Sequence, residues 1–193
     1  MRVLIAEDEA LIRMDMREML IEEGHEVVGE AANGAEAIEL ARELKPEVIF
    51  MDVKMPGMDG IAAAAVIGAE RIAPVVMVTA FSQAKYVEDA STAGAMGYLV
   101  KPFSKKDILP AMAVASARFA EARALEDEVA DLGERLETRK AVEKAKGLLM
   151  AQGVSEADAF RRLQKLAMDR RKSLRDVAEA VLMAAEAQSP DRE

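Results

Sequence analysis

The feature that most constrains the fold is an alternation of short apolar runs with longer segments of helical periodicity. The apolar runs cover residues 3–6, 26–31, 48–51, 75–79 and 97–100. Helical patterns lie between them, at residues 11–23, 35–44, 60–70 and 84–93. Strands that alternate with helices predict βαβ units on a parallel sheet, and runs that are nearly all apolar rather than alternating are typical of strands covered on both faces. We therefore expect an α/β fold with a doubly wound, five-stranded parallel sheet.

The part of the chain after Pro102 shows only helical patterns. Capping boxes that begin with Ser104, Ser155 and Ser173 each precede an apolar-periodic segment, and Gly153 is placed to end the helix before the second box. We expect a long helix followed by a small three-helix domain. The three short helices are expected at residues 139–152, 155–170 and 173–185.

These patterns divide the chain into four parts. We expect a sheet domain at residues 1–120, a coiled-coil-like helical linker at 121–138, a helical domain at 139–187 and a polar tail at 188–193. Charge follows this division, because residues 1–138 contain 14 basic and 26 acidic residues, whereas residues 139–186 contain 11 basic and 7 acidic residues. Such an asymmetry indicates two parts with different partners.

The expected linker carries an apolar seam. Its members are spaced 3, 4, 3 and 4 residues apart, as in a heptad repeat, and charged residues flank them. They are Ala122, Leu125, Val129, Leu132 and Leu136. Such a seam predicts a helix that joins two copies of the chain into a homodimer. The alternative is one amphipathic helix that lies on its own domain.

Composition excludes several classes of site. The chain has no cysteine, which excludes disulfides and thiolate metal sites, and His25 is its only histidine, which excludes a histidine metal cluster and a Ser-His-Asp triad. No apolar run approaches the ~18 residues of a membrane span. The N-terminus turns acidic at Glu7, too soon for a signal peptide. We expect a cytoplasmic protein with no membrane partner.

Five polar residues follow apolar runs at the points where strands are expected to end. They are Glu7, Asp8, Asp52, Thr79 and Lys101. In a doubly wound sheet, sites form outside the carboxyl ends of the strands. A single polar residue there is usually just solvated, but five such residues together predict one pocket.

The residue types in this pocket predict phosphoryl chemistry. Clustered carboxylates favour a hard divalent cation, and Mg²⁺ prefers a few carboxylate oxygens plus water. Asp52 is then a usable nucleophile toward phosphorus, with Lys101 balancing charge and Thr79 donating a hydrogen bond to a phosphoryl oxygen. The backbone carbonyl of Lys54 is placed to complete the metal shell.

The first 120 residues resemble the receiver domain of two-component response regulators. The resemblance rests on Glu7-Asp8, on Asp52 with Met55-Pro56-Gly57-Met58-Asp59-Gly60, on Thr79-Ala80 and on Lys101-Pro102-Phe103. It implies a flavodoxin-like sheet flanked by five helices. It also implies that a sensor histidine kinase phosphorylates Asp52, and that Mg²⁺ binds Asp8, Asp52 and the Lys54 carbonyl, with Glu7 in the outer shell.

The same resemblance implies how the domain would switch. Thr79 and Tyr98 look like a pair in which the hydroxyl moves toward the phosphoryl group and the ring follows inward, although Tyr98 could instead be an ordinary half-buried aromatic. Lys101-Pro102 is expected to be a cis bond. Lys54 and Phe81 occupy positions that influence phosphoryl lifetime in this family, and the bulk of Phe81 predicts an aspartyl phosphate that is not especially short-lived.

Residues 139–185 resemble an ANTAR domain, the antitermination module named for the AmiR and NasR regulators. The resemblance rests on the stretch from Arg139 to Met150 (RKAVEKAKGLLM) and on Glu156-Ala157, Ala159-Phe160, Leu163, Ala167-Met168 and Val177-Ala178. It implies that the module binds RNA stem-loops and so controls transcription antitermination. Phe160 is expected in the core, so that stacking of bases on aromatic rings would not dominate.

The basic residues of this module form the expected RNA surface, since neutralisation of phosphates drives most affinity of this kind. The residues selected as contacts are Arg139, Lys140, Lys144, Lys146, Arg170, Arg171 and Lys172. Two alternatives remain open, namely a DNA-binding response regulator and a signalling adaptor that binds only protein. The chain lacks a second catalytic constellation, so we do not expect a turnover enzyme.

Overall fold

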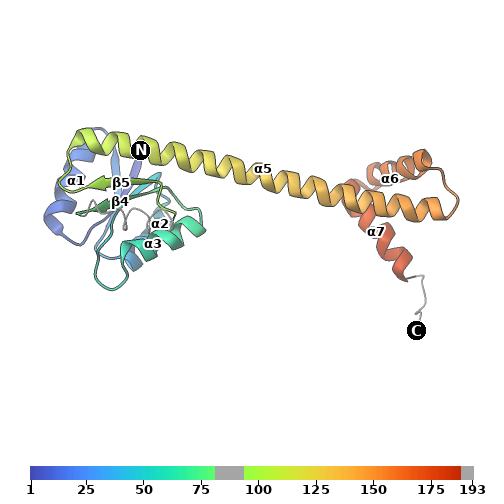
Figure 1. Cartoon of the computed structure of the whole chain (residues 1–193), viewed down its shortest axis with the longest axis horizontal. Helices are drawn as coiled ribbons and strands as arrows, with labels where there is room; N and C mark the ends of the chain where they lie inside the picture. Colours follow the sequence, from blue (N-terminus) through green and yellow to red (C-terminus); the bar gives the residue numbers. More distant parts are fainter. Residues whose placement is uncertain (81–93, 188–193) are drawn as a thin grey trace. The chain divides into compact units, whose positions relative to one another are not determined.

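The structure is a computed structural model that describes residues 1–80 and 94–187, and Figure 1 shows its helices and strands. The chain divides into two compact units, Met1–Arg123 and Ala124–Glu193. The helix predicted at residues 84–93, the side chain of Phe81 and the tail at residues 188–193 lie outside the described residues.

Within the described residues, five parallel strands form one sheet in the order β2-β1-β3-β4-β5. The strands are β1 (Arg2–Ala6), β2 (Glu26–Ala31), β3 (Val48–Asp52), β4 (Val75–Thr79) and β5 (Gly97–Val100). Every residue of β3 and β4 is buried, as expected for central strands covered on both faces. The predicted fold class is confirmed, and each predicted strand lies within one residue of its observed bounds.

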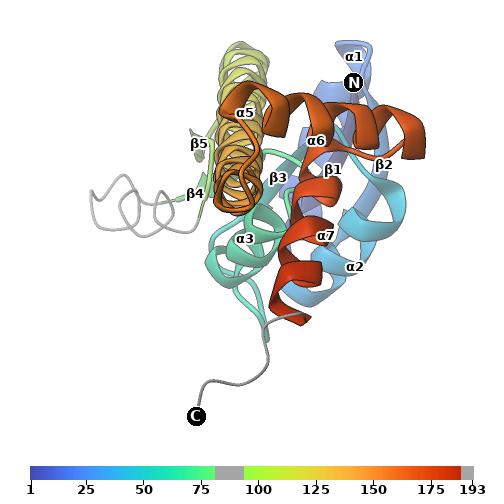
Figure 2. The ribbon, with the colours of Figure 1, turned by 90° about the vertical axis from the view of Figure 1, so that its right-hand side faces the viewer.

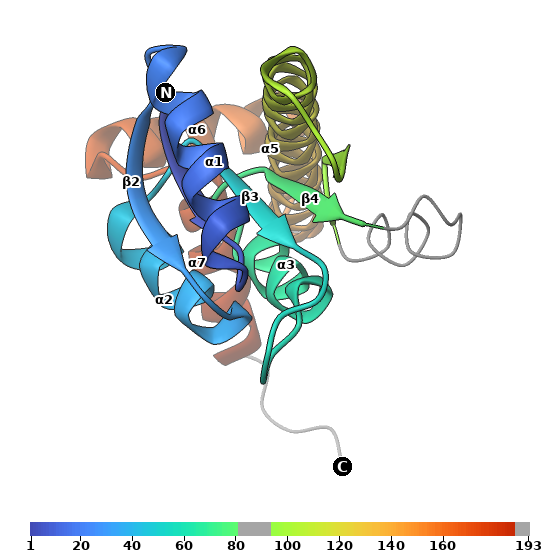
Figure 3. The ribbon, with the colours of Figure 1, turned by 90° about the vertical axis from the view of Figure 1, so that its left-hand side faces the viewer.

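Helices cover both faces of this sheet (Figure 3). On one face, α2 (Gly34–Leu44) and α3 (Gly60–Ala69) pack through residues such as Ile38 and Ile67. On the other face, α1 (Ala10–Glu22) packs with Met16 and Leu20 beside the first part of α5 (Lys105–Ala151), which contributes Ile108. The sheet is therefore the middle layer of three, and its carboxyl edge stays free for a site.

Local chemistry fixes where the helices next to that edge begin. The Asn33 side chain accepts the backbone N–H of Glu36, and the Asp59 side chain accepts the N–H of Ala62 at 2.8 Å, so both side chains act as N-caps. Only glycine fits at position 60, because a Cβ there would lie 1.9 Å from the carbonyl oxygen of Asp52. The loop after β3 is thus folded back against the strand end.

The long helix α5 begins at the first predicted capping box, where the Ser104 N–H and hydroxyl both donate to the Asp107 carboxylate. It then continues without interruption to Ala151. The separate helix predicted to begin near Arg139 was therefore wrong, because that segment is the last part of α5. Gly133 costs only about 1 kcal/mol in a helix interior and does not end it.

The second unit has its own core. Ala141 and Ala145 of α5 meet Leu163 of α6 (Glu156–Arg170) and Ala178 of α7 (Leu174–Ala187) in one buried cluster. Figure 2 shows α6 and α7 beside the end of α5. The two remaining capping boxes are present. The Ser155 hydroxyl accepts the backbone N–H of Asp158, and Ser173 and Asp176 each accept the backbone N–H of the other. Gly153, at φ +88°, follows α5, as predicted.

No helix among residues 1–80 and 94–187 combines the length and the apolar character that crossing a bilayer requires.

Candidate functional site

Strand register brings the predicted polar residues to one edge of the sheet. Ala6 of β1 pairs with Met51 of β3, and Thr79 of β4 pairs with Val100 of β5, so the residues that end these strands lie side by side. A pocket of about 310 Å³ opens there. Its lining residues are Asp8, Glu9, Asp52, Val53, Lys54, Thr79, Ala80 and Lys101.

Three carboxylates converge in this pocket. Oxygens of Glu7, Asp8 and Asp52 all lie within 4.8 Å of one another. Glu7 and Asp52 are buried, whereas Asp8 is exposed at the mouth. Two buried carboxylates and one open to solvent form a donor set suited to a hard divalent cation that keeps part of its water shell.

Lys101 neutralises two of these carboxylates. Its Nζ lies 2.7 Å from Oε2 of Glu7 and 2.8 Å from Oδ1 of Asp52. Burial raises the pKa of the Glu7 carboxyl, and the ion pair with Lys101 opposes that rise. The pKa of Lys101 is raised by its two carboxylate partners, against the effect of its own burial. The ammonium of Lys101 therefore lies beside carboxylates that could also bind a divalent cation.

The loop after β3 holds the central carboxylate in place. The backbone N–H of Lys54 donates to Oδ2 of Asp52 at 3.0 Å, and the N–H of Gly60 donates to the carbonyl of Val53. Both oxygens of Asp52 thus have a partner, one in the loop and one in Lys101. The strand therefore fixes the position of Asp52, while the loop gives access to it.

The two residues predicted to switch lie on the same face of the sheet. Thr79 pairs with Val100, and Tyr98 lies two residues before Val100 on β5, so both side chains point to one side. Thr79 is buried in the pocket wall. Tyr98 is half-buried, and this burial raises the pKa of its hydroxyl. The Lys101-Pro102 bond is cis, as predicted.

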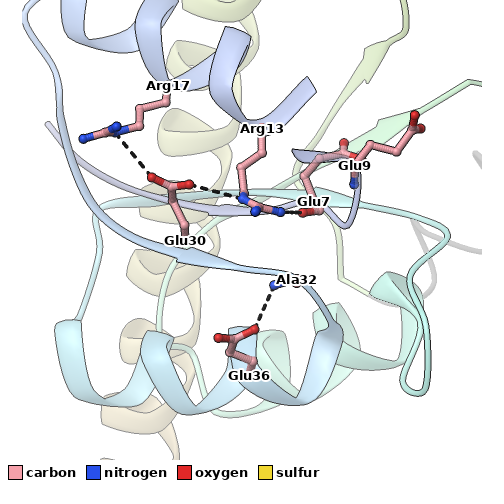
Figure 4. Close-up of polar contacts among 7 residues, drawn as sticks. All are labelled: Glu7, Glu9, Arg13, Arg17, Glu30, Ala32 and Glu36. Carbon is pink, nitrogen blue, oxygen red and sulfur yellow. Dashed lines mark hydrogen bonds and ion pairs between the residues drawn. The ribbon is translucent and has the colours of Figure 1, made fainter. Parts of the chain in front are cut away.

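Sequence reasoning missed Arg13. Its guanidinium donates to the carbonyl of Glu7 and also pairs with Glu30 at 3.2 Å, and Arg17 pairs with the other oxygen of Glu30 (Figure 4). Arg13 thereby ties the backbone that carries two of the carboxylates to α1 and β2. The sequence did contain a signal for Arg13, because it stands three residues before the buried Met16 and so on the stripe of α1 that faces the core.

The basic residues predicted to contact RNA differ in their surroundings. Arg139, Lys144, Arg170, Arg171 and Lys172 are exposed, and none forms an ion pair with the described part of the chain. Arg170, Arg171 and Lys172 are consecutive at the turn between α6 and α7, and we call them the basic turn.

Two members of the predicted set are already neutralised. Lys140 pairs with Glu137 at 2.8 Å. Lys146 is only 8% exposed, and its Nζ lies 3.0 Å from Glu143 and 2.8 Å from Glu156. The structure therefore places Lys146 in an internal ion cluster, whereas the other members of the set stay on the surface.

The expectation for Phe160 was wrong. Its ring is 37% exposed, because the buried stripe of α6 runs through Ala159 and Leu163 and leaves Phe160 on the flank. It lines a surface pocket with residues of α5 and with Leu174.

Comparison with known proteins agrees with both parts of this description. Residues 3–113 match the response regulator receiver domain family, and residues 130–182 match the ANTAR domain family. The transcriptional regulatory protein PdtaR of Mycobacterium tuberculosis is 62% identical over 182 residues, which span 94% of this chain and 89% of that protein. The chemotaxis protein CheY of Bacillus subtilis is 42% identical over 112 residues, spanning 58% of this chain and 93% of CheY.

Solved structures resemble the first unit. The signal receiver domain of the putative response regulator NarL from Mycobacterium tuberculosis superimposes with a TM-score of 0.58 at 33% identity, covering 60% of this chain and 95% of that one. The response regulator domain of Thermotoga maritima CheB gives a TM-score of 0.56 at 32% identity, covering 61% and 96% of the two chains.

Proposed function

Because this chain belongs to the response regulators that combine a receiver domain with an ANTAR domain, we propose that phosphorylation of Asp52 controls RNA binding by its C-terminal helices. The observation that carries this proposal is the meeting of three carboxylates, Thr79 and Lys101 in one pocket at the carboxyl edge of the sheet. A sensor histidine kinase is the proposed donor, and transcription antitermination through RNA stem-loops is the proposed output.

The transfer step follows from the positions of these groups. A carboxylate oxygen of Asp52 forms a bond to phosphorus while the bond between phosphorus and the donor imidazole nitrogen breaks, and the imidazole keeps the electron pair. Lys101, now 2.8 Å from Asp52, balances the charge of the transferred group. Thr79, in the pocket wall, donates a hydrogen bond to a phosphoryl oxygen.

We assign Mg²⁺ to Asp8, Asp52 and the backbone carbonyl of Lys54, with Glu7 in the outer shell. The donor set fits, since all the side-chain ligands are carboxylates and their oxygens lie within 4.8 Å of one another. When bound, the ion would draw charge from the phosphoryl oxygens and relieve repulsion among the carboxylates. Glu7 stays paired with Lys101 at 2.7 Å, which suits an outer-shell role.

Replacing Arg13 with methionine is expected to weaken Mg²⁺ binding about tenfold, the size of effect seen when a group that orients metal ligands is lost. The variant loses the contact that fixes the Glu7 carbonyl, next to Asp8. Isothermal titration with Mg²⁺ measures this. Arg17→Met is the matched control, because Arg17 pairs with Glu30 without touching Glu7. Equal weakening by both variants would contradict the role given to Arg13.

Phosphorylation is proposed to bias an equilibrium between two conformations. Drawing Thr79 and Lys101 toward the new charge would let Tyr98 follow, which alters the surface of β5 and of the start of α5 beside it. The exposed seam of α5 is the element that we expect to respond. Its residues Leu125, Val129, Leu132 and Leu136 are 53–61% exposed, so a second copy can bury them in a homodimer.

RNA binding is proposed for the exposed cations of the second unit, foremost the basic turn. Arg139, Lys140 and Lys144 remain in the proposed surface, whereas Lys146 is omitted because two carboxylates already hold its ammonium. The domain limits of 1–120, 121–138 and 139–187 are kept as proposals. A dimer would present two such surfaces, which matches paired stem-loops and raises apparent affinity through linkage.

Replacing Arg170 with glutamine is expected to weaken binding of the whole protein to an RNA hairpin about fivefold near 0.1 M salt and to reduce the salt slope by almost one. Fluorescence anisotropy at several salt concentrations measures both. Arg161→Gln on the same helix is the matched control, because Arg161 is already paired with Asp158 at 2.8 Å. If salt does not change the RNA affinity of the wild type, of Arg170→Gln or of Arg161→Gln, a signalling adaptor that binds only protein would be favoured. Full competition by duplex DNA would favour a DNA-binding regulator.

A further inference from the structure

A groove between α6 and α7 has no role in the function proposed so far. Its volume is about 430 Å³, within the range of sites that hold small molecules. Its apolar walls are formed by Leu166, Val177, Ala180, Val181 and Ala184. Ala180 and Ala184 are exposed, so the groove is open to solvent along α7.

The basic turn lies at one end of this groove, and two of its residues, Arg170 and Lys172, line it. Neither forms an ion pair with the described residues. Other cations of the unit, such as Lys140, Arg161 and Arg175, each pair with a carboxylate within 3 Å. The groove therefore combines apolar walls with two cations and one carboxylate, that of Asp176, and this excess of positive charge is complementary to a nucleotide.

A rival pocket of about 420 Å³ lies beside Phe160, and an exposed aromatic ring is an obvious platform for a base. However, three carboxylates line that pocket, those of Asp131, Glu134 and Glu143. They outnumber its two cations, Arg135 and Arg139, and Arg135 is already paired with Asp131. Carboxylates repel the phosphates on either side of a bound base. The groove between α6 and α7 is favoured because its two cations outnumber its single carboxylate, Asp176.

We propose that this groove takes one unpaired base of an RNA loop, while the phosphates next to that base contact Arg170 and Lys172. The inference rests on the proposed RNA-binding function and adds how the protein distinguishes a loop from a stem. A paired base is held in the stack and cannot enter, whereas a loop base can be splayed out into a pocket.

Asp176 adds a preference among bases. It lines the groove, and one of its oxygens accepts the N–H of Ser173 at 3.2 Å. Hydrogen bonding to Ser173 also lowers the pKa of Asp176, which keeps the carboxylate ionised and able only to accept. The amino group of adenine offers two hydrogens to this carboxylate, whereas uracil offers only its single ring N–H. Adenine loops are therefore expected to bind more tightly than uracil loops of equal length.

The test uses the whole protein and two RNA hairpins with the same stem. One has a loop of adenosines, and the other has a loop of abasic nucleotides, which keeps every phosphate and removes the bases. Ala180→Leu fills the groove from an exposed helix position, and Ala184→Leu does so one turn later. Ala157→Leu, at an exposed position of α6 outside the groove, is the matched control. Circular dichroism checks that each variant is folded.

The wild type and Ala157→Leu should bind the adenosine loop about tenfold more tightly than the abasic loop, because the base buries apolar surface against the walls of the groove. Ala180→Leu and Ala184→Leu should bind both loops equally, at the abasic level. An unchanged preference in both groove variants overturns the inference but leaves RNA binding intact. If the wild type binds neither hairpin with salt-dependent affinity, the proposed function itself fails and takes the inference with it. Loss of self-association instead of base preference would assign the groove to a second copy of the chain.

Discussion

An Asp52→Asn variant is expected to take up no phosphate from a small phosphoryl donor in the presence of Mg²⁺, whereas the wild type takes up one. The amide cannot act as the nucleophile, and it also removes a charge from the proposed Mg²⁺ site. Intact-mass spectrometry measures the difference directly. The effect is the largest that we expect, because Asp52 is the carboxylate that the strand, the Lys54 N–H and Lys101 together hold in place.

Glu9→Gln is the matched control for this experiment. Glu9 lines the same pocket and its backbone N–H donates to Glu7, but its side chain has no proposed part in the chemistry. The control should be phosphorylated like the wild type. Phosphate on the Asp52→Asn protein at the wild-type level would show that another residue is the acceptor.

Replacing Leu132 with lysine is expected to raise the dimer dissociation constant of the phosphorylated protein on the order of a hundredfold. Burial of a partly exposed leucine contributes about 1.5 kcal/mol, and a dimer contains two copies, so about 3 kcal/mol is lost before the new charges repel each other. Leu132 is 55% exposed within the unit that contains it, so the substitution leaves that unit's own core intact. Light scattering over a concentration series measures the dissociation constant.

Ala130→Lys provides the same charge on an exposed position of α5 outside the seam. It should dimerise like the wild type. Leu132→Lys should bind an RNA with two hairpins more weakly than the wild type does, whereas Ala130→Lys should bind it as tightly as the wild type. The reason is that only a dimer presents two basic modules to one transcript. If both lysine variants stay dimeric, the seam is not the interface.

The sheet and the acidic pocket could be predicted from the sequence because their signals are local. Each strand reads as an apolar run, and each functional side chain follows directly after a run has ended, as Asp52 does after Val48–Met51. Parallel topology then brings these ends together without further information. The Lys101 contacts at 2.7 and 2.8 Å are the outcome of that geometry.

Features that depend on how one element packs against another could not be predicted in the same way. Arg13 of α1 contacts the carbonyl of Glu7, just after β1, and its second partner is Glu30 of β2. Lys146 was counted as a surface cation, yet it stands on the stripe of α5 that also carries Val142 and Leu149, and Glu156 of α6 reaches it. Phe160 lies outside the core, because the buried positions of α6 are Ala159 and Leu163.

Control of the RNA-binding helices by the receiver pocket should appear as a change in RNA affinity on phosphorylation. The affinity of the whole protein for an RNA with two hairpins is measured by anisotropy before and after phosphorylation, at fixed salt and Mg²⁺. We expect phosphorylation to tighten binding about tenfold, within the usual range of coupling between two sites, and Asp52→Asn to show no change. Equal affinity of the phosphorylated and unphosphorylated wild type would show that the receiver pocket does not control RNA binding.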